Sequence, residues 1–253
     1  MRAFVARLCK RNFKKNELKP HLKRTWCIGK IDAAFIAKME QVLWLYSLPY
    51  DPECPVFCFD ERPCFLIGDM VEPLSMQSGQ IRKEHYAYEK NGSCALLLAI
   101  EPLTGQRIAE VYPQRTKREY ALFMKQLATQ CPGAKKIRLV QDNLNTHNAS
   151  SFYQHFTAEE AFELAQRFEF IYTPKSASWL NMVEIEFSAL SKQCLSRRIP
   201  TIEKLSAEVL AIVKERKRRG IRINWQFSIE CAREKLNSHY EKANSQNTKF
   251  KKT

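Results

Sequence analysis

Three acidic residues at or near the ends of apolar segments are candidates for metal chemistry. Asp60 ends the stretch FCFD, Asp142 ends IRLVQD, and Glu184 lies within WLNMVEIEF. Functional groups of open sheets stand at the carboxyl ends of strands, where the chain leaves the core but the scaffold stays rigid. Two aspartates that met there would repel each other, and one would tend to stay protonated. A divalent cation removes that conflict, because Mg²⁺ prefers hard oxygen ligands.

Helical geometry selects Glu184 as the third acid. At about 100° per residue, the apolar residues of this segment form one stripe of a helix: Leu180, Val183, Phe187, Leu190 and Cys194. Glu184 falls on one flank of the stripe beside Asn181, and Glu186 falls on the opposite flank. Only one of the two glutamates can share a site with Asn181. The pattern favours Glu184 and predicts that Glu186 is a solvated surface residue.

Spacing alone leaves a structural explanation open for each of these polar residues. Acids at strand ends are common turn formers and helix caps, and Asp142 could cap a helix that follows it. Asn143 and Asn145 suit any turn. A single histidine such as His147 is more typical of a packed or loop residue than of a ligand.

The pattern of apolar residues predicts an α/β fold. Strands are predicted at PVFCFDE, CALLLAI, RIAEVY, IRLVQ and FEFIYT, and helices over residues 31–48, 116–130, 148–168, 180–195 and 201–220. The stretch EPLTGQ indicates a hairpin, and Thr116 with Glu119 predicts a capping box. Residues 62–92 predict a long loop or flap. An antiparallel hairpin followed by alternating helices and strands predicts a mixed sheet with helices on both faces.

The charge balance favours a polyanionic partner. The chain has 253 residues, which is enough for one sizeable core with a small appended module. Its 41 Lys and Arg residues against 27 Asp and Glu residues give a net charge of +14. Nucleic acid is the commonest partner of so basic a surface, and a merely basic globular protein is the alternative.

Membrane insertion and zinc binding are both disfavoured by the sequence. The longest clean apolar run, CALLLAI, is far too short to span a bilayer, and the basic start MRAFVARLCKRNFKK does not predict a signal peptide. Nine cysteines lie in apolar surroundings. The tightest group lacks a Cys-x-x-Cys pair and a nearby histidine: Cys54, Cys58 and Cys64. Reduced thiols in a cytoplasmic protein are therefore expected.

Three motifs carry a resemblance to a known family. FCFDERP, LVQDNLNTH and TPKSASWLNMVEIEFSAL resemble the catalytic motifs of bacterial insertion-sequence transposases related to mariner elements, the DDE group with an RNase H-like fold. They occur in the expected order, and the likeness covers about residues 16–240. It implies a basic helical segment over 1–50, as a remnant of or linker from a helix-turn-helix DNA-binding region. An RNase H-like catalytic domain would follow over 51–240, and a disordered basic tail over 241–253.

The resemblance implies metal-dependent cleavage of DNA at transposon ends and strand transfer into target DNA. Asp60, Asp142 and Glu184 would be the catalytic acids and would hold two Mg²⁺ or Mn²⁺ ions. Four further residues would support the metal shell or the scissile phosphate: Asn143, Asn145, His147 and Asn181. Basic residues expected to contact DNA are Lys175, Arg216, Lys217, Arg218 and Arg219.

The resemblance also implies partners and a location. Double-stranded DNA would be bound both as transposon inverted repeats and as target, by a homodimer in which residues 62–92 clamp the partner subunit, or form only a plain surface loop. A cytoplasmic, nucleoid-associated bacterial protein is expected.

Two departures from the family pattern keep other functions open. The gap of residues 143–183 is longer than in the usual mariner pattern, and TAEEAFELAQRF accounts for the extra length. Of the helix-turn-helix modules, only something like the last basic segment, ELKPHLKRTW, is present. A truncated, inactive transposase that inhibits by binding DNA or a full-length partner is one alternative. An RNase H-like nuclease acting on RNA–DNA hybrids is another.

Overall fold

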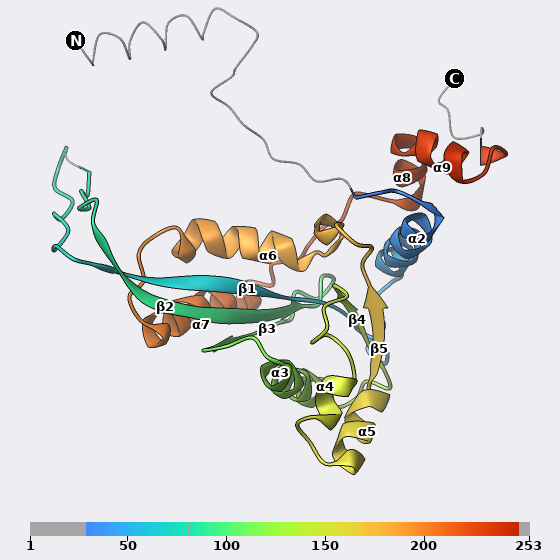
Figure 1. Cartoon of the computed structure of the whole chain (residues 1–253), viewed down its shortest axis with the longest axis horizontal. Helices are drawn as coiled ribbons and strands as arrows, with labels where there is room; N and C mark the ends of the chain where they lie inside the picture. The colour runs from blue at the N-terminus through green and yellow to red at the C-terminus, as the bar shows by residue number, and fades with distance from the viewer. Residues whose placement is uncertain (1–28, 80, 248–253) are drawn as a thin grey trace, which may run out of the picture.

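The computed structural model describes residues 29–79 and 81–247, which include a five-stranded mixed sheet (Figure 1). The strand order is β3-β2-β1-β4-β5. The strands are β1 (Val56–Asp69), β2 (Tyr88–Ile100), β3 (Arg107–Tyr112), β4 (Ile137–Gln141) and β5 (Phe168–Tyr172). The first three pair antiparallel, whereas β4 pairs parallel with both β1 and β5. The predicted mixed α/β sheet is therefore confirmed.

Helices cover both faces of the sheet. On one face lie α3 (Lys117–Gln130), α4 (Ser150–Tyr153) and α5 (Ala158–Gln166). On the other lie α2 (Ala33–Ser47), α6 (Val183–Leu190), α7 (Ile202–Arg218), α8 (Ile229–Lys235) and α9 (Asn237–Ala243). Figure 1 shows α6 and α3 on opposite sides of the strands. Among the described residues, no helix is both long and apolar enough to cross a membrane.

The alternation of side chains along the central strands explains these two layers. Phe57 and Phe59 of β1 pack into the core under α3, whereas Cys58 and Cys64 pack into the core under α6. Strand β2 divides in the same way, with Leu97 facing α3. Because successive side chains of a strand point to opposite faces, one buried strand supplies both cores. Strands such as these therefore read as continuous apolar runs.

Several predicted boundaries agree with the structure. The capping box of α3 is present, with the Glu119 carboxylate accepting the Thr116 N–H at 2.9 Å. Helix α7 follows its N-cap Thr201 and ends before Gly220, which has a φ of 59°. The hairpin of β2 and β3 and the strands β4 and β5 were also predicted correctly. Capping and periodicity are local signals, which is why they carry over directly from sequence.

The predicted long loop over residues 62–92 is confirmed in its middle and wrong at both ends. Strand β1 continues through Asp69 and pairs with β2, so the irregular part is confined to residues 70–87. Strand β1 includes Pro63, and β4 pairs only with residues 56–58 of β1. The later part of β1 is therefore an edge, where a proline is tolerated. Asp60 accordingly lies inside a strand and does not end one.

Other helical predictions were wrong in detail. The helix expected over 180–195 is divided into a 3-10 turn at Ser178–Leu180, the helix α6, and a π-helical turn at Ser191–Leu195. The helical segments expected over 148–168 are confirmed as α4 and α5, whereas α8 and α9, which follow α7, were not predicted. The end of α9 falls within the predicted tail. Residues 1–28 and 248–253, including the segment ELKPHLKRTW, lie outside the described residues.

Glu186 is buried, not solvated as predicted. It is 0% exposed, and its carboxylate accepts hydrogen bonds from two arginines. Arg107 of β3 donates Nε to Oε2 at 2.9 Å and Nη2 to Oε1 at 2.8 Å, and Arg216 of α7 donates two bonds of 2.9 Å. Periodicity identified the flank of the helix correctly, but it could not show that β3 and α7 cover that flank.

This buried ion cluster predicts a large loss of stability on removal of the carboxylate. Glu186→Gln would leave two largely buried guanidinium groups without a counter-charge, so the free energy of unfolding should fall by about 3–5 kcal/mol. The matched control is Glu160→Gln, which removes the exposed partner of Lys125 and should cost less than about 1 kcal/mol. Urea denaturation followed by circular dichroism measures both. Equal losses in the two variants would contradict the assignment.

Candidate active site

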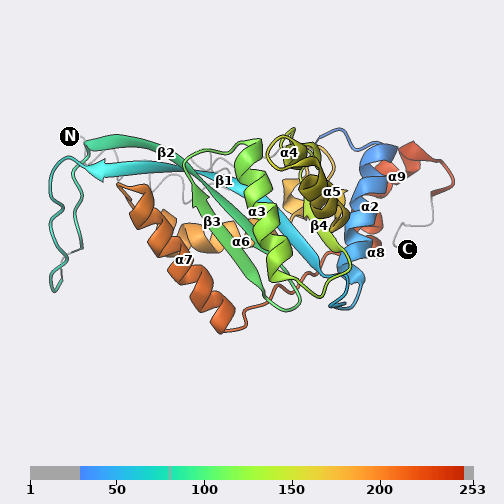
Figure 2. The ribbon, with the colours of Figure 1, turned by 90° about the horizontal axis from the view of Figure 1, so that it is seen from below.

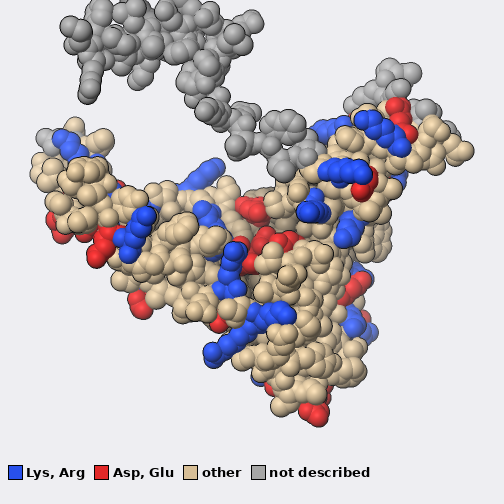
Figure 3. Space-filling view, in the orientation of Figure 1, with Lys and Arg blue, Asp and Glu red and all other residues tan. Residues whose placement is uncertain are grey.

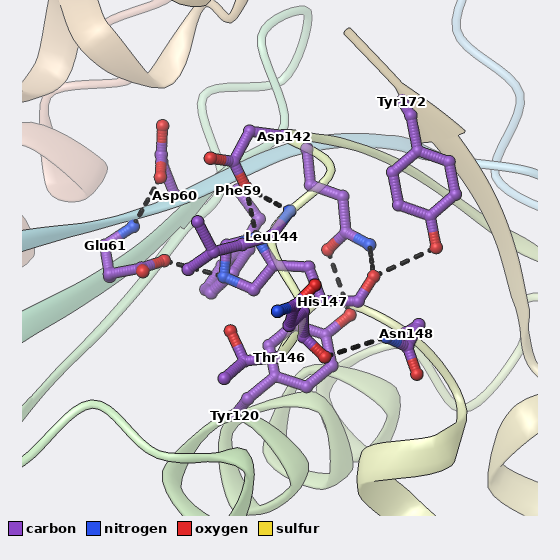
Figure 4. Close-up of polar contacts among 12 residues, drawn as sticks. Phe59, Asp60, Glu61, Tyr120, Asp142, Leu144, Thr146, His147, Asn148 and Tyr172 are labelled. Carbon is purple, nitrogen blue, oxygen red and sulfur yellow. Dashed lines mark hydrogen bonds and ion pairs between the residues drawn. The ribbon is translucent and has the colours of Figure 1, made fainter. Parts of the chain in front are cut away.

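The parallel register of β1 and β4 brings Asp60 and Asp142 together. Cys58 pairs with Val140, and each aspartate lies two residues further along its own chain. Side chains repeat with a period of two along a strand, so Asp60 points to the same face as Cys58. Figure 4 shows the carboxylates of Asp60 and Asp142 near each other. The two aspartates predicted from sequence therefore lie side by side, one on β1 and one directly after β4.

Each of these carboxylates has one oxygen held by the protein. Oδ1 of Asp60 accepts the N–H of Glu61 at 2.8 Å. Oδ1 of Asp142 accepts the N–H of Leu144 at 3.2 Å and lies 2.5 Å from Nδ1 of His147. Within the described part of the chain, no hydrogen bond or ion pair reaches Oδ2 of either aspartate. In Figure 4 the second oxygen of Asp142 points toward Asp60.

The two aspartates have opposite pKa shifts. Burial, with a smaller contribution from the Asp142 charge, raises the pKa of Asp60 to about 7 against the opposing N–H of Glu61. Burial also acts to raise the pKa of Asp142, but the hydrogen bond and charge of His147 outweigh it and lower that pKa. Two converging carboxylates, each with a free oxygen, are a hard donor set. The pair therefore fits a divalent cation.

His147 is a buried link between two carboxylates. Its side chain is 2% exposed, and its ring stacks on Tyr120 at a centroid distance of 5.1 Å. Nδ1 faces Asp142 at 2.5 Å, and Nε2 faces Oε2 of Glu61 at 2.7 Å. Burial opposes a charged ring, but the bonds to Asp142 and Glu61 prevail and raise the pKa of His147 to about 9. At neutral pH the ring is thus a cation that orients Asp142.

A second set of contacts holds the backbone of His147. The carbonyl of His147 accepts Nε2 of the buried Gln141 at 2.8 Å and the hydroxyl of Tyr172 at 2.9 Å. The hydroxyl of Tyr120 donates to Oε1 of Gln141 at 2.9 Å. Sequence reasoning missed Gln141 and Glu61, although each stands beside a predicted catalytic aspartate. The two tyrosines carry no local signal of this role.

The asparagines predicted to support the site divide into two groups. Asn143 and Asn145 have exposed side chains that make no described contact with Asp142. Asn181 is buried, and its Nδ2 donates to the carbonyl of Phe59 at 2.8 Å. This bond ties the turn before α6 to β1 at the residue preceding Asp60.

Glu184 stands apart from the aspartate pair. Glu184 lies in the first turn of α6, and its side chain is exposed. The protein around it still removes part of its solvent, which raises the pKa of Glu184, and the Arg62 charge opposes that shift. Among the residues that the structure describes, no three His, Cys, Asp or Glu side chains are grouped closely enough to hold one metal ion. The structure therefore brings two of the three predicted acids together. It leaves the third on the neighbouring helix.

The basic residues predicted to contact DNA lie at separate places on the surface. Figure 3 shows acidic side chains in the middle of one face, with Lys and Arg side chains around them. Lys175 is exposed and lines a groove with Lys30 and Lys38 of the α2 region. At the end of α7, the exposed predicted contacts are Lys217, Arg218 and Arg219. Arg216 differs, because its side chain is 13% exposed and is paired with Glu186.

The raised pKa of Asp60 predicts a pH-dependent gain in stability on its replacement. The unfolded chain releases this proton near pH 4 and the folded chain near pH 7, so stability falls as the pH rises between them. Asp60→Asn removes this loss, and we expect the free energy of unfolding to rise by about 1–3 kcal/mol at pH 8. At pH 4 the gain should vanish. Urea denaturation in EDTA at both pH values measures the difference.

Asp142→Asn is the matched control, with the opposite sign. The lowered pKa of Asp142 contributes stability that is present above its unfolded pKa and is lost as the pH falls through the folded value. This variant should therefore be less stable than the wild type at pH 8. If Asp60→Asn gave the same gain at pH 4 and pH 8, the strain at Asp60 would not be electrostatic.

Comparison with known proteins places this geometry in a family. The model of the DDE superfamily endonuclease matches residues 55–206. A search of the curated proteins gave no match. Among solved structures, the Mos1 transposase paired-end complex with left transposon end is 13% identical, with a TM-score of 0.53 over 97% of this chain and 71% of that chain. The Mos1 mariner paired-end complex with Mn is 14% identical, with a TM-score of 0.52 over 97% and 72%.

A pre-cleavage Mos1 transpososome gives the same result, with 13% identity and a TM-score of 0.53 over 96% of this chain and 71% of that chain. At this level of identity the likeness concerns the fold, and it confirms the RNase H-like architecture predicted from the motifs. Because the family model covers more than half of the sequence and includes both converging aspartates, the chain belongs to the DDE superfamily of endonucleases.

Proposed function

We propose that this chain is the catalytic part of a DDE transposase, which cleaves DNA at transposon ends and joins the freed strand to target DNA. The observation that carries the proposal is the pair of converging carboxylates, Asp60 and Asp142, on a basic protein of an endonuclease family. The fold shared with Mos1, which has been solved before cleavage and as a strand transfer complex, supports it.

The acids are proposed to hold Mg²⁺ or Mn²⁺. Oδ2 of Asp60 and Oδ2 of Asp142 would be ligands, and Glu184 would complete the site from α6. Mos1 paired-end complexes with Mn and with Mg support the choice of metals. A bound cation would supply charge stabilisation at the phosphodiester and a lower pKa for an attacking water. The number of ions, two, remains a prediction from the resemblance.

The side chains around the metal site have separate tasks in this proposal. Asp142 is held by His147, and Asp60 by the N–H of Glu61, so both carboxylates keep one oxygen directed at the metal. In the first reaction the oxygen of water would bond to phosphorus and the P–O3′ bond would break, which leaves a 3′-hydroxyl and a 5′-phosphate. In the second, that 3′-hydroxyl would bond to the phosphorus of a target phosphodiester, whose own 3′-oxygen leaves as a hydroxyl. The protein's contribution is orientation of the groups and stabilisation of charge.

DNA would approach the site along its basic surroundings. The net charge of +14 favours the phosphate backbone of both transposon ends and target. Lys175, together with Lys30 and Lys38, would contact one stretch of backbone. Lys217, Arg218 and Arg219 would contact another, whereas Arg216 is not included because Glu186 binds it. A bacterial host and a nucleoid-associated, cytoplasmic location remain predictions from sequence.

Loss of metal-dependent nicking in the acid variants tests this function. The substrate is a supercoiled plasmid that carries the DNA flanking the gene, and conversion to nicked circles is followed on gels with Mg²⁺ or Mn²⁺. Asp60→Asn, Asp142→Asn and Glu184→Gln should each reduce the rate roughly 100-fold or more, because each removes a ligand charge. Glu163→Gln, an exposed change on α5, should leave the rate unchanged.

Other outcomes would select the other functions. Equal nicking by wild type and Asp142→Asn would reject the catalytic assignment. Cleavage of an RNA–DNA hybrid with no cleavage of duplex DNA would identify an RNase H-like nuclease. Metal-independent DNA binding without turnover under any metal would favour a truncated transposase that acts as an inhibitor. The separation of Glu184 from the aspartates makes this last measurement informative.

A homodimer is proposed to form through the tip between β1 and β2. Figures 1 and 2 show this hairpin extending beyond the helices. Residues at and near the tip expose large apolar side chains: Phe65 72%, Met70 66%, Leu74 67%, Met76 74%, Ile81 80% and Tyr86 86%. So many apolar groups on one projecting arm are typical of an interaction surface. A second copy of this chain is the proposed partner, as the family resemblance implies.

Charges placed on this arm should separate the subunits. Met76→Lys combined with Ile81→Lys puts two cations into a surface that must be desolvated, so we expect a dimer to become a monomer at equal protein concentration. Light scattering coupled to size-exclusion chromatography gives the mass. Phe162→Lys, at a side chain 56% exposed on α5, should leave the mass unchanged. A wild-type chain that stays monomeric with bound transposon-end DNA would rule the proposal out.

A further inference from the structure

Glu61 is a buried carboxylate with no role in the reaction described so far. It follows Asp60 on β1 and, by alternation along the strand, points to the opposite face, toward α3. Its side chain is 7% exposed. A carboxylate in such a place is costly unless cations and hydrogen bonds compensate it. The partners of Glu61 are therefore informative.

Two cationic groups face Glu61, and one is much closer than the other. Nε2 of His147 lies 2.7 Å from Oε2, whereas Nη1 of Arg115 lies 3.8 Å from Oε1 on a side chain that is 59% exposed. The imidazole is thus its main partner. The same ring meets Asp142 through Nδ1 at 2.5 Å. Each ring nitrogen thus faces a carboxylate oxygen, an arrangement that suits a protonated imidazole with an N–H group on both nitrogens.

We propose that Glu61 is a positioning residue for the metal site, which acts on Asp142 through His147. The inference rests on the proposed function and assigns a part to a residue outside the metal ligands. The contacts run from Glu61, on the α3 side of β1, to the ring of His147, and from that ring to Asp142, which follows β4 (Figure 4). They hold Oδ1 of Asp142 and leave Oδ2 for the metal.

The surroundings of the ring explain why the far carboxylate matters. Tyr120 stacks on one side of His147 and Phe59 meets it edge-on at 5.3 Å, so the plane of the ring is set by packing. Packing does not distinguish the two orientations of the ring that differ by a half-turn about its Cβ–Cγ bond. The contacts of Nδ1 with Asp142 at 2.5 Å and of Nε2 with Glu61 at 2.7 Å select one of them. Without the acceptor at Glu61, one of these two constraints is lost.

Asp142 would then be held less firmly. The remaining contact of its Oδ1 is the N–H of Leu144, at the longer distance of 3.2 Å. A carboxylate with a single long hydrogen bond rotates more freely about its Cβ–Cγ bond and spends less time in the orientation that a cation requires. Partners of metal ligands typically contribute 10–100-fold to metal affinity. The effect of Glu61 should fall in that range.

Mn²⁺ binding to the full chain tests this role apart from catalysis. The dissociation constant is measured by electron paramagnetic resonance of free Mn²⁺, and the metal dependence of nicking is measured in parallel. Glu61→Ala should weaken Mn²⁺ binding about 10–100-fold and raise the Mn²⁺ concentration for half-maximal nicking equally. Glu61→Gln keeps an acceptor oxygen at the same reach, so it should retain most of the affinity.

Glu101→Ala is the matched control for loss of a buried glutamate. Glu101 is 2% exposed, and its carboxylate accepts the N–H of Leu103 at 3.2 Å in the turn after β2, away from the site. This variant should lose stability without a change in Mn²⁺ affinity. If Glu61→Ala does not fold, Glu61→Asp keeps the charge and withdraws the acceptor by one methylene, and it should show the same weakening.

The outcomes separate the positioning role from the proposed function. If the wild type binds no Mn²⁺ at the site, so that Asp142→Asn changes nothing, the metal chemistry itself fails. If the wild type binds Mn²⁺ and Glu61→Ala binds it as tightly, only the positioning role is overturned. Loss of folding in both Glu61→Ala and Glu61→Asp would make Glu61 a purely structural residue and would also overturn it.

Discussion

The parallel pairing of β1 with β4 is the constraint on which the site depends. It ends at Cys58 and Val140, and both aspartates follow that last pair at the same spacing. Beyond it, β4 stops and frees the loop that carries Asp142, while β1 continues rigidly against β2. A slip of one residue would send one carboxylate to the opposite face of the sheet. Register, more than the identity of any one ligand, therefore creates the acidic pair.

The positively charged neighbours of the acids then determine which carboxylate remains without a counter-charge and could bind a cation. His147 neutralises Asp142, and two arginines neutralise Glu186, so both of these carboxylates have lowered pKa values. Asp60 receives only a backbone N–H and has a raised pKa. The uncompensated charge is thus concentrated beside Oδ2 of Asp142. In the described residues this is where an added cation would lower the electrostatic energy of the buried acids.

Sequence patterns predicted most helices and strands but not the contacts between them. Capping residues and periodicity placed α3, α7 and most strands, because these signals lie within a few residues of one another. The two aspartates were found because each follows a run of apolar residues in the sequence. Glu186 was misjudged, since a helical pattern identifies a flank and not the element packed against it. Glu61 was missed for a related reason, because its partner His147 belongs to a distant loop.

The attachment of α6 to β1 explains why the position of Glu184 does not depend on the length of the chain before it. Two hydrogen bonds fix this helix region to β1: Asn181 donates to the carbonyl of Phe59 at 2.8 Å, and Arg62 donates to the carbonyl of Phe187 at 3.1 Å. Asp60 lies between these two attachment points on the strand. The stretch TAEEAFELAQRF, to which the extra length was assigned, contains α5 on the opposite face. Glu184 is therefore positioned by the strand that carries Asp60, and the length of the chain between Asp142 and α6 has little influence on it.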